Sequence, residues 1–366
     1  MRKKLAYIGH AYHEKTRSTE FLIDIFKSSF DVDIFTYNMD NCKFYGEKET
    51  RLEKYDALVL FQMPVPLELL KENFQFDVAS YFPMYDGTGE APDDFWIGYK
   101  DFNIINFSST LHKRLQKIGL STNYIQFFPE PKNIINWGDS TSAFFWNRRE
   151  IINVNSLERI FEDLKLKSLH LHVAMDPNEK ITLAKEEIKN KYLVTQSEWF
   201  DTREIMQETI EKSSIYIAPR PYEGIGMSFL EAMSMGRCVI SPNNPTMNEY
   251  IINGVTGFLY EIDNPRLFVD ANISDIQQQT YKYIQNGYKK WENEKFKILI
   301  WILQKPNSKA LNTTKVLCNH KFLGFNLLTK RIDGYFWIFN KFKLNNKVLF
   351  TLKRIIRKKG VWFGYN

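Results

Sequence analysis

The stretch SIYIAPRPYEGIGMSFLEAMSMGRCVISPNNPTMNEYIINGVTGFLYE, residues 214–261, decides the fold. Its apolar run at residues 215–218 predicts a buried strand, which Pro221 ends. Gly224 and Gly226 then allow the backbone to approach a ligand closely. A helix that begins near Gly226 points its unpaired N–H groups and the positive end of its dipole at the same place. The pattern therefore predicts a phosphate-sized anion site between a strand and a helix.

Two carboxylates flank this site in the sequence. Glu223 comes directly before Gly224, and Glu231 lies on the expected helix, with seven residues between the two carboxylates. Ser228 and Glu231 are three positions apart and share a polar face of that helix, while Phe229 belongs to its apolar face. Ionised carboxylates only accept hydrogen bonds, so they suit a ligand with vicinal hydroxyl groups. A turn glutamate and a solvated helix glutamate are the simpler alternatives for these two residues taken singly.

The segment resembles the donor-binding half of retaining glycosyltransferases with the two-domain GT-B fold, in particular glycosyltransferase family 4. The signature of that family is E-G-x-G-x-x-x-x-E-A-M-x-x-G, followed by a strand of small residues and a Gly-x-x-Gly stretch. Here residues 223–236 read EGIGMSFLEAMSMG, and Gly254 and Gly257 follow. Spacing, residue types and the order of elements all agree, which makes the match more specific than a lone G-x-G.

The resemblance implies a role for each matched residue. Glu231 would hold the ribose hydroxyls of a nucleotide sugar, and Glu223 the hydroxyls of the sugar that is transferred. The helix N-terminus near Gly226 and Met227 would hold a phosphate between them. The donor-binding residues expected in this way are Arg220, Gly224, Gly226, Met227, Ser228 and Glu231, and the catalytic residues are Glu223, Arg148 and Arg149.

The resemblance also implies cations for the diphosphate. In the family, an Arg at the end of a strand and a Lys about five residues later neutralise it, and Arg148 is the better match here, with Arg149 as its rival. The Lys is missing, because residues 152–155 read INVN. Either Arg149 or Arg220 takes over its charge, or the phosphate site is weaker than usual; arginine suits bidentate phosphate binding. A surface arginine pair that satisfies nearby acids is the alternative. The resemblance implies no metal ion and no cofactor besides the nucleotide-sugar donor.

Composition and length indicate a cytoplasmic protein. The 366 residues, with 29 Phe, 19 Tyr and 8 Trp, suffice for two core-forming domains and a tail. Cys42, Cys238 and Cys318 have neither metal-ligand nor disulfide spacing, which is typical of a reducing compartment, and Cys238 is expected in the core. The first residues lack the apolar run of a signal peptide, and the run at residues 298–303 falls short of the ~20 residues that span a bilayer.

The order of elements predicts two domains. Strands are expected at residues 4–9, 31–37, 57–63, 76–81, 103–107 and 124–128, with helices at 18–30 and 109–118. A polar linker is expected at 129–142, after which strands at 143–147, 168–175 and 192–195 alternate with helices at 156–165 and 202–213. This α/β alternation predicts the GT-B class, two Rossmann-like doubly wound domains that face a central cleft. We expect an N-terminal acceptor-side domain at 1–135, a C-terminal nucleotide-sugar-binding domain at 136–290 and a basic amphipathic tail at 291–366.

The acceptor side has weaker signals. His10 and His13 follow the first strand, and Asp86 lies in a turn after the strand at 76–81. The carboxyl ends of strands bind ligands in open α/β sheets, so either histidine is a candidate to bind an acceptor hydroxyl or phosphate. Loop residues without a ligand are the alternative.

Two other classes of site have less support. No G-x-G-x-x-G follows the first strand, which argues against a nicotinamide-dependent dehydrogenase. His170 and His172 alternate on one expected strand, but a zinc site needs two further ligands nearby, so core or surface histidines are favoured.

The tail holds the basic character of the chain. The net charge is +6 overall, yet residues 291–366 contain 16 Lys and Arg against 3 Asp and Glu. Residues 347–359, KVLFTLKRIIRKK, predict an amphipathic helix, and aromatic residues follow it. This pattern suits an anionic membrane surface, here assigned to residues 347–365. A last helix packed on the core is the main alternative. No nucleic-acid-binding motif accompanies the charge, so nucleic acid is not an expected partner.

These features lead to one expected function and several rivals. We expect a retaining glycosyltransferase, peripheral at the inner face of the membrane, that moves a sugar from a UDP or GDP sugar to a glycan or lipid-linked acceptor. Its role would be in bacterial surface polysaccharide synthesis, and its reaction would be metal-independent. A sugar-nucleotide epimerase or a glycan phosphorylase of the same fold would differ in its product. A catalytically weak, membrane-docked partner of another transferase is the third alternative, suggested by the missing Lys.

Overall fold

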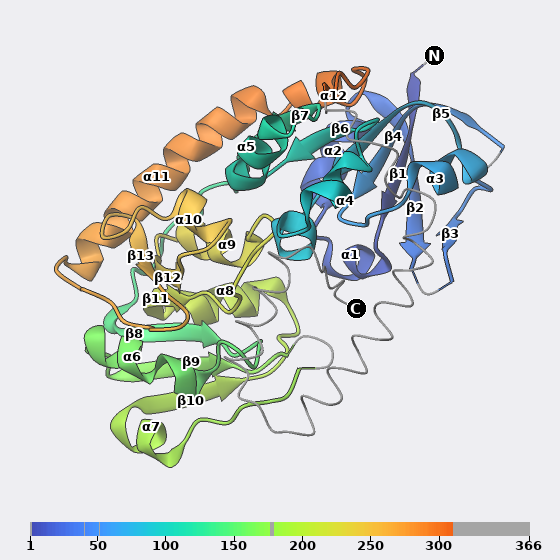
Figure 1. Cartoon of the computed structure of the whole chain (residues 1–366). Coiled ribbons are helices and arrows are strands. Elements are labelled where there is room, and N and C mark those ends of the chain that lie inside the picture. Colours follow the sequence, from blue (N-terminus) through green and yellow to red (C-terminus); the bar gives the residue numbers. More distant parts are fainter. Residues whose placement is uncertain (1, 40, 51, 176–178, 310–366) are drawn as a thin grey trace. The chain divides into compact units, whose positions relative to one another are not determined.

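The computed structural model describes residues 2–39, 41–50, 52–175 and 179–309 (Figure 1). These residues form two compact units. Unit 1 comprises the described residues up to Gln126 together with those from Asn293 onward, and unit 2 is Phe127–Glu292. The sequence-based division placed the two boundaries at 135/136 and 290/291. The predicted membrane-binding segment at 347–365 lies outside the described residues.

Unit 1 is built on a sheet of seven strands in the order β3-β2-β1-β4-β5-β6-β7. All neighbouring pairs are parallel except β2 and β3. The strands are β1 (Lys3–Gly9), β2 (Phe30–Asn38), β3 (Lys43–Gly46), β4 (Lys54–Phe61), β5 (Gln75–Phe82), β6 (Asn103–Asn106) and β7 (Thr122–Tyr124). From β1 the chain proceeds to β2 on one side, and from β4 it proceeds to β7 on the other. The order of strands therefore reverses between β1 and β4, which is the topological switch point of this sheet.

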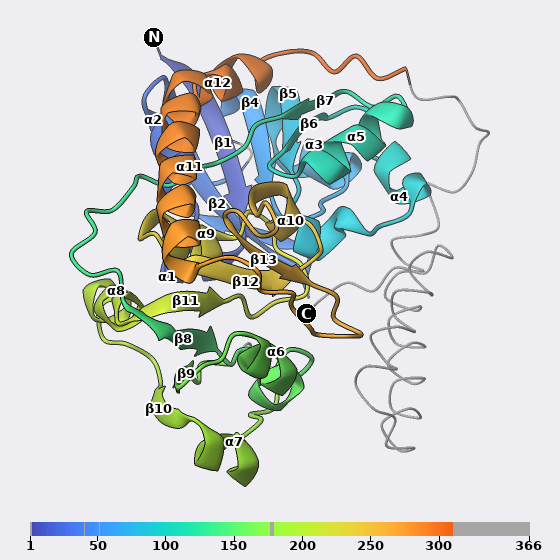
Figure 2. The same ribbon diagram turned by 90° about the vertical axis from the view of Figure 1, so that its left-hand side faces the viewer.

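Helices cover both faces of this sheet. They are α1 (Ala11–Thr16), α2 (Glu20–Lys27), α3 (Leu67–Asn73), a π-helical turn η1 (Tyr85–Gly89), α4 (Asp93–Ile97), α5 (Ser109–Lys117) and α12 (Lys297–Trp301). Figure 2 shows α2 on one side of the strands and α3 and α5 on the other, as right-handed crossovers from the switch point require. In α2 the buried residues Leu22, Ile25 and Phe26 recur at helical spacing, which gives the helix its core-facing stripe.

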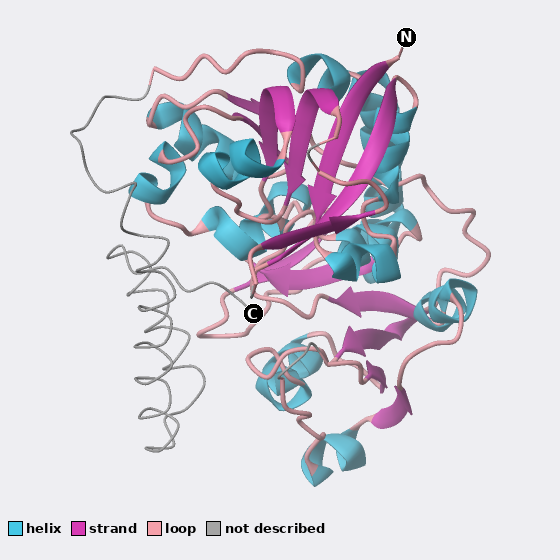
Figure 3. Ribbon diagram, turned by 90° about the vertical axis from the view of Figure 1, so that its right-hand side faces the viewer, coloured by secondary structure: helices cyan, strands magenta, loops and turns pink. Residues whose placement is uncertain are grey.

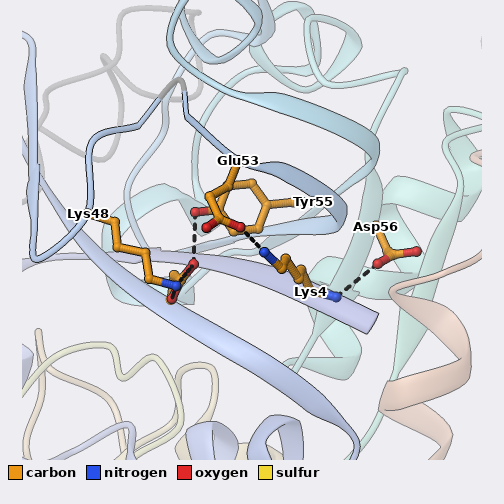
Figure 4. Close-up of polar contacts among 6 residues, drawn as sticks. Lys4, Lys48, Glu53, Tyr55 and Asp56 are labelled. Carbon is orange, nitrogen blue, oxygen red and sulfur yellow. Dashed lines mark hydrogen bonds and ion pairs between the residues drawn. The ribbon is translucent and has the colours of Figure 1, made fainter. Parts of the chain in front are cut away.

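Polar contacts hold the amino ends of the strands in register (Figure 4). The Lys4 amide donates to Asp56 Oδ2 over 2.9 Å, and the Lys4 ammonium pairs with Glu53, so β1 is bound to the start of β4. Asp33 of β2 accepts from the Tyr55 hydroxyl at 3.0 Å and pairs with Lys48 at 2.8 Å. These contacts lie at the opposite end of the sheet from the carboxyl strand ends.

The chain returns to unit 1 after unit 2. The buried residue Asn103 donates from Nδ2 to the carbonyls of Trp301, at 3.1 Å, and Gln304. The Ser121 amide donates to Ser308 Oγ over 2.8 Å. Ile298 and Ile302 are fully buried, so this segment supplies part of the core of unit 1. Residues 293–309, which the sequence analysis assigned to the tail, therefore belong to a folded unit because of these two isoleucines.

Unit 2 is built on a six-stranded, fully parallel sheet in the order β10-β9-β8-β11-β12-β13. Its strands are β8 (Asp139–Trp146), β9 (Ser168–His172), β10 (Leu193–Ser197), β11 (Ser213–Ile217), β12 (Cys238–Pro242) and β13 (Gly257–Tyr260). Its helices are a 3₁₀ turn η2 (Val154–Leu157), α6 (Glu158–Asp163), α7 (Glu186–Lys191), α8 (Arg203–Glu211), α9 (Met227–Ser234), α10 (Met247–Tyr250) and α11 (Ile273–Glu294), and Figure 3 distinguishes them from the strands by colour. The strand order reverses between β8 and β11, so these two strands mark its switch point.

A buried arginine ties unit 2 together. Arg237 is 0% exposed and donates to the carbonyls of Asn136, Glu211, Ser213 and Met235 over 2.7–3.2 Å. Burial lowers its pKa to about 10, so the guanidinium remains charged at neutral pH. The cation therefore neutralises the carbonyl ends of two helices and anchors the start of β8.

The predicted α/β class and most predicted elements are confirmed, and two predictions along the chain are wrong. The strand expected at 124–128 ends at Tyr124, because Phe127 and Phe128 are used for packing: their rings contact Trp291 and Tyr250. The linker expected at 129–142 ends earlier, since β8 begins at Asp139. The first residues of β8 are polar, so their sequence resembles that of a loop. In the structure they belong to a strand that pairs with β11, and the Ser142 and Ser213 hydroxyls lie 2.9 Å apart.

Candidate functional site

The signature segment of unit 2 lies at the topological switch point of its sheet. β11 ends at Ile217 and is followed by the loop that contains Glu223 and Gly226, while β8 ends at Trp146 and is followed by Arg148. The two strands are parallel neighbours, with Tyr216 opposite Phe144. The residues that sequence analysis singled out from two distant segments therefore emerge at the same edge of the sheet.

Gly226 forms the start of α9 and admits no other residue without rearrangement. Its φ is +87°, in the left-handed region, and a Cβ atom at this position would lie 1.8 Å from Cε1 of Phe229. Its carbonyl accepts the first helical hydrogen bond, from the Leu230 amide at 3.0 Å. Gly226 thus lets the loop turn sharply into the helix, whose first amides point back towards the loop.

Glu223 is held by a loop that the sequence analysis did not identify. The glutamate is 7% exposed, and its amide donates to the Pro245 carbonyl over 3.2 Å. After β12, Asn244 Nδ2 donates to the Pro221 carbonyl over 3.0 Å, and Thr246 Oγ1 donates to the Ile225 carbonyl over 3.3 Å. The residues at 244–246 therefore fix the backbone on both sides of the carboxylate.

Glu231 lies on α9 and is half-buried. Its Oε1 atom accepts a hydrogen bond from Gln207 Nε2 of α8 over 2.6 Å. This contact orients the carboxylate from outside the signature, and α8 carries no motif that would have predicted it. Ser228, which shares the polar face of α9, is half-buried as well.

Tyr216 shows that the predicted residues come together. Its side chain is buried in β11, and burial raises its pKa, while a hydrogen bond with the Ser228 side chain acts in the other direction. Glu223 and Glu231 also raise the pKa of this hydroxyl and Arg148 lowers it, so all three charges act on one phenol. The switch point of unit 2 thus combines two carboxylates, a cation and a helix N-terminus.

Arg148 is positioned by aromatic side chains. Its guanidinium carbon lies 4.6 Å from the ring centroid of Trp146, a cation–π contact. The indole Nε1 of Trp146 donates to the Ala174 carbonyl over 2.8 Å, which fixes the ring. Burial, His170 and Arg148 together lower the pKa of His172 to about 4. The nearby His172 ring is therefore neutral, and Arg148 is a permanent positive charge beside it.

The two other arginines pair with different carboxylates. Arg149 lies 3.1 Å from Glu179, and the second oxygen of Glu179 accepts from the Glu150 amide over 2.8 Å. Arg220 lies 3.6 Å from Glu223, and both of these side chains are largely buried. Of the two candidates for the second phosphate cation, Arg220 thus contacts a signature residue, whereas Arg149 contacts a residue outside the signature.

His170 and His172 belong to a hydrogen-bonded row on β9 and β10. His170 lies 2.9 Å from both Thr195 Oγ1 and Ser197 Oγ, and His172 Nδ1 lies 3.0 Å from Ser197 Oγ. The His172 ring stacks on Phe200, with a centroid distance of 4.5 Å. In the part of the chain that the structure describes, no cluster of three or more His, Cys, Asp or Glu side chains is arranged to hold a metal ion.

The expected acceptor-side residues lie in unit 1. His10 and His13 follow β1, and Asp86 belongs to η1, which follows β5. β1 and β5 both pair with β4 in parallel, so His13 and Asp86 follow strand ends at one edge of the sheet, and Asp86 acts electrostatically on His13. Gln62, which follows β4 and contacts His13, was not singled out from the sequence because a glutamine after a strand carries no motif.

Comparisons with known proteins agree with this organisation. Residues 146–277 match the model of the family described as glycosyl transferases group 1. A search of curated protein sequences finds no match. Solved structures that are similar include a glycosyltransferase from Rickettsia africae, with 13% identity and a TM-score of 0.57 over 83% of this chain and 99% of that one. The lipopolysaccharide outer core galactosyltransferase WaaB matches with 14% identity and a TM-score of 0.52, over 81% of this chain and 99% of that one.

A third similar structure is longer than this chain. A mutant of S. aureus TarM, in complex with fondaparinux, alpha-GlcNAc-glycerol and UDP, matches with 13% identity and a TM-score of 0.51. The match covers 72% of this chain and 61% of TarM, so this chain spans about three fifths of the length of that protein. At these identities the likeness concerns the fold, which is GT-B. Within residues 2–309, apart from the gaps given above, no helix combines the length and the apolar character needed to cross a membrane.

Proposed function

We propose that this chain, whose residues 146–277 form a group 1 glycosyl transferase domain within a GT-B fold, is a retaining glycosyltransferase that uses a UDP or GDP sugar. The observation that carries the proposal is the pairing of β8 with β11, which brings Arg148, Glu223 and the N-terminus of α9 to one edge of the sheet. The charges of Glu223, Glu231 and Arg148 all act on the Tyr216 hydroxyl there. A nucleotide sugar has a diphosphate anion between two rings rich in hydroxyls. Two carboxylates on either side of a positive site match that pattern of charge.

The donor is bound by residues with separate roles. Glu231, oriented by Gln207, holds the ribose hydroxyls, and Glu223 holds the hydroxyls of the transferred sugar. The first amides of α9, at Met227 and Ser228, bind a phosphate. Because Glu223 is buried and its loop is fixed by residues 244–246, little reorganisation is needed when the donor binds.

The leaving diphosphate is stabilised by two arginines. Arg148 is the first, held against Trp146, and Arg220 replaces the missing Lys, because it already lies beside Glu223. Arg149 is held by Glu179 and has a structural role at the end of β8. These two cations and the helix N-terminus supply positive charge opposite the negative charge that develops on the departing phosphate, so the proposed reaction needs no metal ion.

The acceptor is proposed as a glycan or a lipid-linked glycan, in bacterial surface polysaccharide synthesis at the inner face of the membrane. WaaB is a lipopolysaccharide outer core galactosyltransferase, and the TarM structure holds alpha-GlcNAc-glycerol and UDP, which supports this class of acceptor. The basic segment at 347–365 is proposed to bind the anionic membrane surface. Loss of flotation with anionic vesicles on truncation before Asn345 tests the membrane part of the proposal.

Thermal stabilisation by nucleotides tests the donor site. UDP, GDP, ADP and their sugar conjugates are added to the parent protein and to Glu231→Ala. A ligand at a hundred times its Kd stabilises the folded state by about 2.7 kcal/mol, so a bound nucleotide gives a clear shift. We expect a shift with UDP or GDP that Glu231→Ala loses. Stabilisation by none of the nucleotides would contradict the proposal.

Product analysis then separates transfer from its rivals. A transferase forms a glycoside, with the anomeric configuration of the donor if it is retaining. An isomerised donor indicates an epimerase, and a sugar phosphate indicates a phosphorylase. Activity that persists in a chelator supports the metal-independent mechanism.

A further inference from the structure

The sheet of unit 1 has its own switch point, and the side chains there are of a different kind. His10 and His13 follow β1, Gln62 follows β4, and Asp86 follows β5. The three strands are adjacent in the order β1-β4-β5, so their carboxyl ends meet at one edge. Ligands of open α/β sheets bind outside the carboxyl ends at such a point.

His13 is held at both ring nitrogens. Nδ1 lies 2.8 Å from Ser18 Oγ, and Nε2 lies 2.6 Å from Gln62 Oε1. An amide oxygen only accepts, so Nε2 carries the proton and Nδ1 accepts from the Ser18 hydroxyl. Phe61 packs edge-on against the ring, with a centroid distance of 5.3 Å. The position and the tautomer of His13 are therefore determined by its neighbours.

Gln62 makes this contact from a strained backbone. Its φ is +64°, and the Met63 amide donates to the Phe61 carbonyl over 2.7 Å, which closes a γ-turn of the rare positive-φ type around Gln62. The Gln62 amide donates to the Phe82 carbonyl over 2.8 Å, and its carbonyl accepts from the Tyr81 hydroxyl over 3.1 Å. A non-glycine residue in this region is costly and is found preferentially at functional sites. Glycine would be favoured here if only the turn mattered.

Asp86 is placed by a second unusual backbone element. It lies in the π-helical turn η1, and π-helical turns are frequent at functional sites. The guanidinium of Arg114 donates to the Gly89 carbonyl over 3.1 Å, which fixes the end of this turn. The Asp86 side chain is half-buried, and its charge acts on His13.

The charge of this cluster differs from that of unit 2. Burial lowers the pKa of His13, and His10 lowers it further, while the Gln62 hydrogen bond and Asp86 raise it. The imidazole of His13 is thus neutral at neutral pH. A carboxylate beside a neutral imidazole repels a phosphate and accepts hydrogen bonds from hydroxyl groups.

We propose that the cluster of His13, Gln62 and Asp86 binds a hydroxyl group of a neutral sugar and excludes phosphate. Asp86 accepts the hydrogen bond of that hydroxyl, and Gln62 is a positioning residue that holds His13 in one tautomer beside it. The identification of this sugar as the acceptor rests on the proposed function; the class of ligand follows from the cluster itself.

Histidine signals of the full chain report directly on the site. Methyl hexopyranosides and, separately, inorganic phosphate at equal ionic strength are titrated into ¹⁵N-histidine-labelled protein. We expect saturable shifts of the His13 signals with one or more hexopyranosides and none with phosphate, and Asp86→Asn should abolish them. His112 of α5, hydrogen-bonded to Thr122 of β7, serves as the internal reference. A saturable response to phosphate, or no response to any hexopyranoside, would overturn the proposal.

Variants of Gln62 separate a positioning role from a structural one. Gln62→Gly relieves the strained backbone, so its urea midpoint should not fall below that of the parent, yet the sugar response of His13 should be lost. Gln62→Glu should raise the pKa of His13 in a pH titration of the same histidine signals, whereas the exposed control Gln116→Glu should leave it unchanged. A Gln62→Gly variant that is less stable but still responds to sugar would reduce Gln62 to a structural residue.

The donor site can fail independently of this one. Binding of UDP to the full chain is measured with Glu231→Ala, a change in unit 2, as its control. The His13 response is measured without any nucleotide. A sugar response without any UDP or GDP binding would refute the proposed donor chemistry and leave the hydroxyl site standing. The opposite result would refute the hydroxyl site alone.

Discussion

The two sheets reverse their strand order in the same way, but different chemistry stands at the two reversal points. In unit 2 the strand ends carry Arg148, Arg220, Glu223 and the helix that bears Glu231. In unit 1 they carry His13, Gln62 and Asp86. One arrangement suits an anion flanked by hydroxyl-rich rings, and the other suits an uncharged hydroxyl. Under the two proposals above, the topology selects the place of a ligand, while the loop residues select its charge.

The largest test of this comparison removes a carboxylate from unit 2. Glu231→Ala deletes the proposed acceptor of the ribose hydroxyls, and hydrogen bonds to charged groups contribute about 1.5–3 kcal/mol each. We expect kcat/KM for the donor to fall about a hundredfold to ten-thousandfold. Glu208→Ala, at an exposed position of α8, is the control and should stay near the parent. Donor turnover within a few-fold of the parent for Glu231→Ala would remove the basis for assigning the donor to unit 2.

Two glycines of unit 2 test the backbone of the proposed anion site. Both Gly226 and Gly254 have positive φ, but a Cβ at Gly226 would meet Phe229, while nothing lies within 4 Å at Gly254. Gly254→Ala should cost about 1–2 kcal/mol, the cost of the left-handed conformation alone. Gly226→Ala adds overpacking and should cost about 3 kcal/mol. Urea unfolding measures the free energy of unfolding of both variants. Equal losses of stability would mean that the contact with Phe229 adds nothing to the cost at Gly226.

The neutral histidine of unit 2 should make the protein sensitive to acid. Because the pKa of His172 is lowered to about 4, the unfolded chain binds a proton near pH 6.5 that the folded chain binds only near pH 4. Stability contributed by neutral His172 is therefore present above pH 6.5 and lost as the pH falls to 4, by about 3 kcal/mol. His172→Phe keeps the stacking on Phe200 and should reduce the difference in urea midpoint between pH 7 and pH 4.5.

The matched change in unit 1 is His112→Phe. Burial also lowers the pKa of His112, but its side chain is only half-buried, so we expect a smaller reduction in acid sensitivity. An equal effect of the two changes would indicate that acid sensitivity does not distinguish the two units.

The smallest expected effect concerns the returning segment of unit 1. Ser308 Oγ donates to the Lys100 carbonyl over 2.7 Å and accepts from the Ser121 amide. Ser308→Ala should cost about 1 kcal/mol, and hydrogen exchange of the Ser121 amide should become faster. Ser274→Ala, at an exposed serine of α11, should change stability by less than about 0.5 kcal/mol. Unchanged exchange at Ser121 would show that Ser308 does not hold this segment.

The carboxylates of unit 2 were accessible to sequence reasoning because their signal is local. Glu223, Gly226 and Glu231 lie within one short loop and one helix, so spacing alone relates them. The supporting residues were not accessible: Gln207 and Asn244 reach the site from other elements and carry no motif of their own. Arg148 was found by its place after a strand, but the pairing of Arg149 with Glu179 and of Arg220 with Glu223 required the structure.

In unit 1 the strands were predictable and the site was only partly so. Apolar runs indicated β1, β4 and β5, and His10, His13 and Asp86 followed from the rule that ligands bind at strand ends. The contribution of Gln62 depends on a positive φ, which no glutamine adopts by preference, so tertiary contacts with Phe82 and Tyr81 must impose it. The packing of residues 293–309 in unit 1 was not predicted from the sequence. Their basic composition indicated a tail, although Ile298 and Ile302 are buried.

The return of the chain to unit 1 has a consequence for synthesis on the ribosome. Unit 2 is a single continuous segment, so it can complete its fold as soon as its last helix has emerged. Unit 1 begins first, yet its core lacks Ile298 and Ile302 until the segment at 293–309 has been made. Until then, Asn103 Nδ2 also lacks the carbonyl of Trp301 to which it donates. The half of the protein that is translated first is therefore the half that finishes folding last.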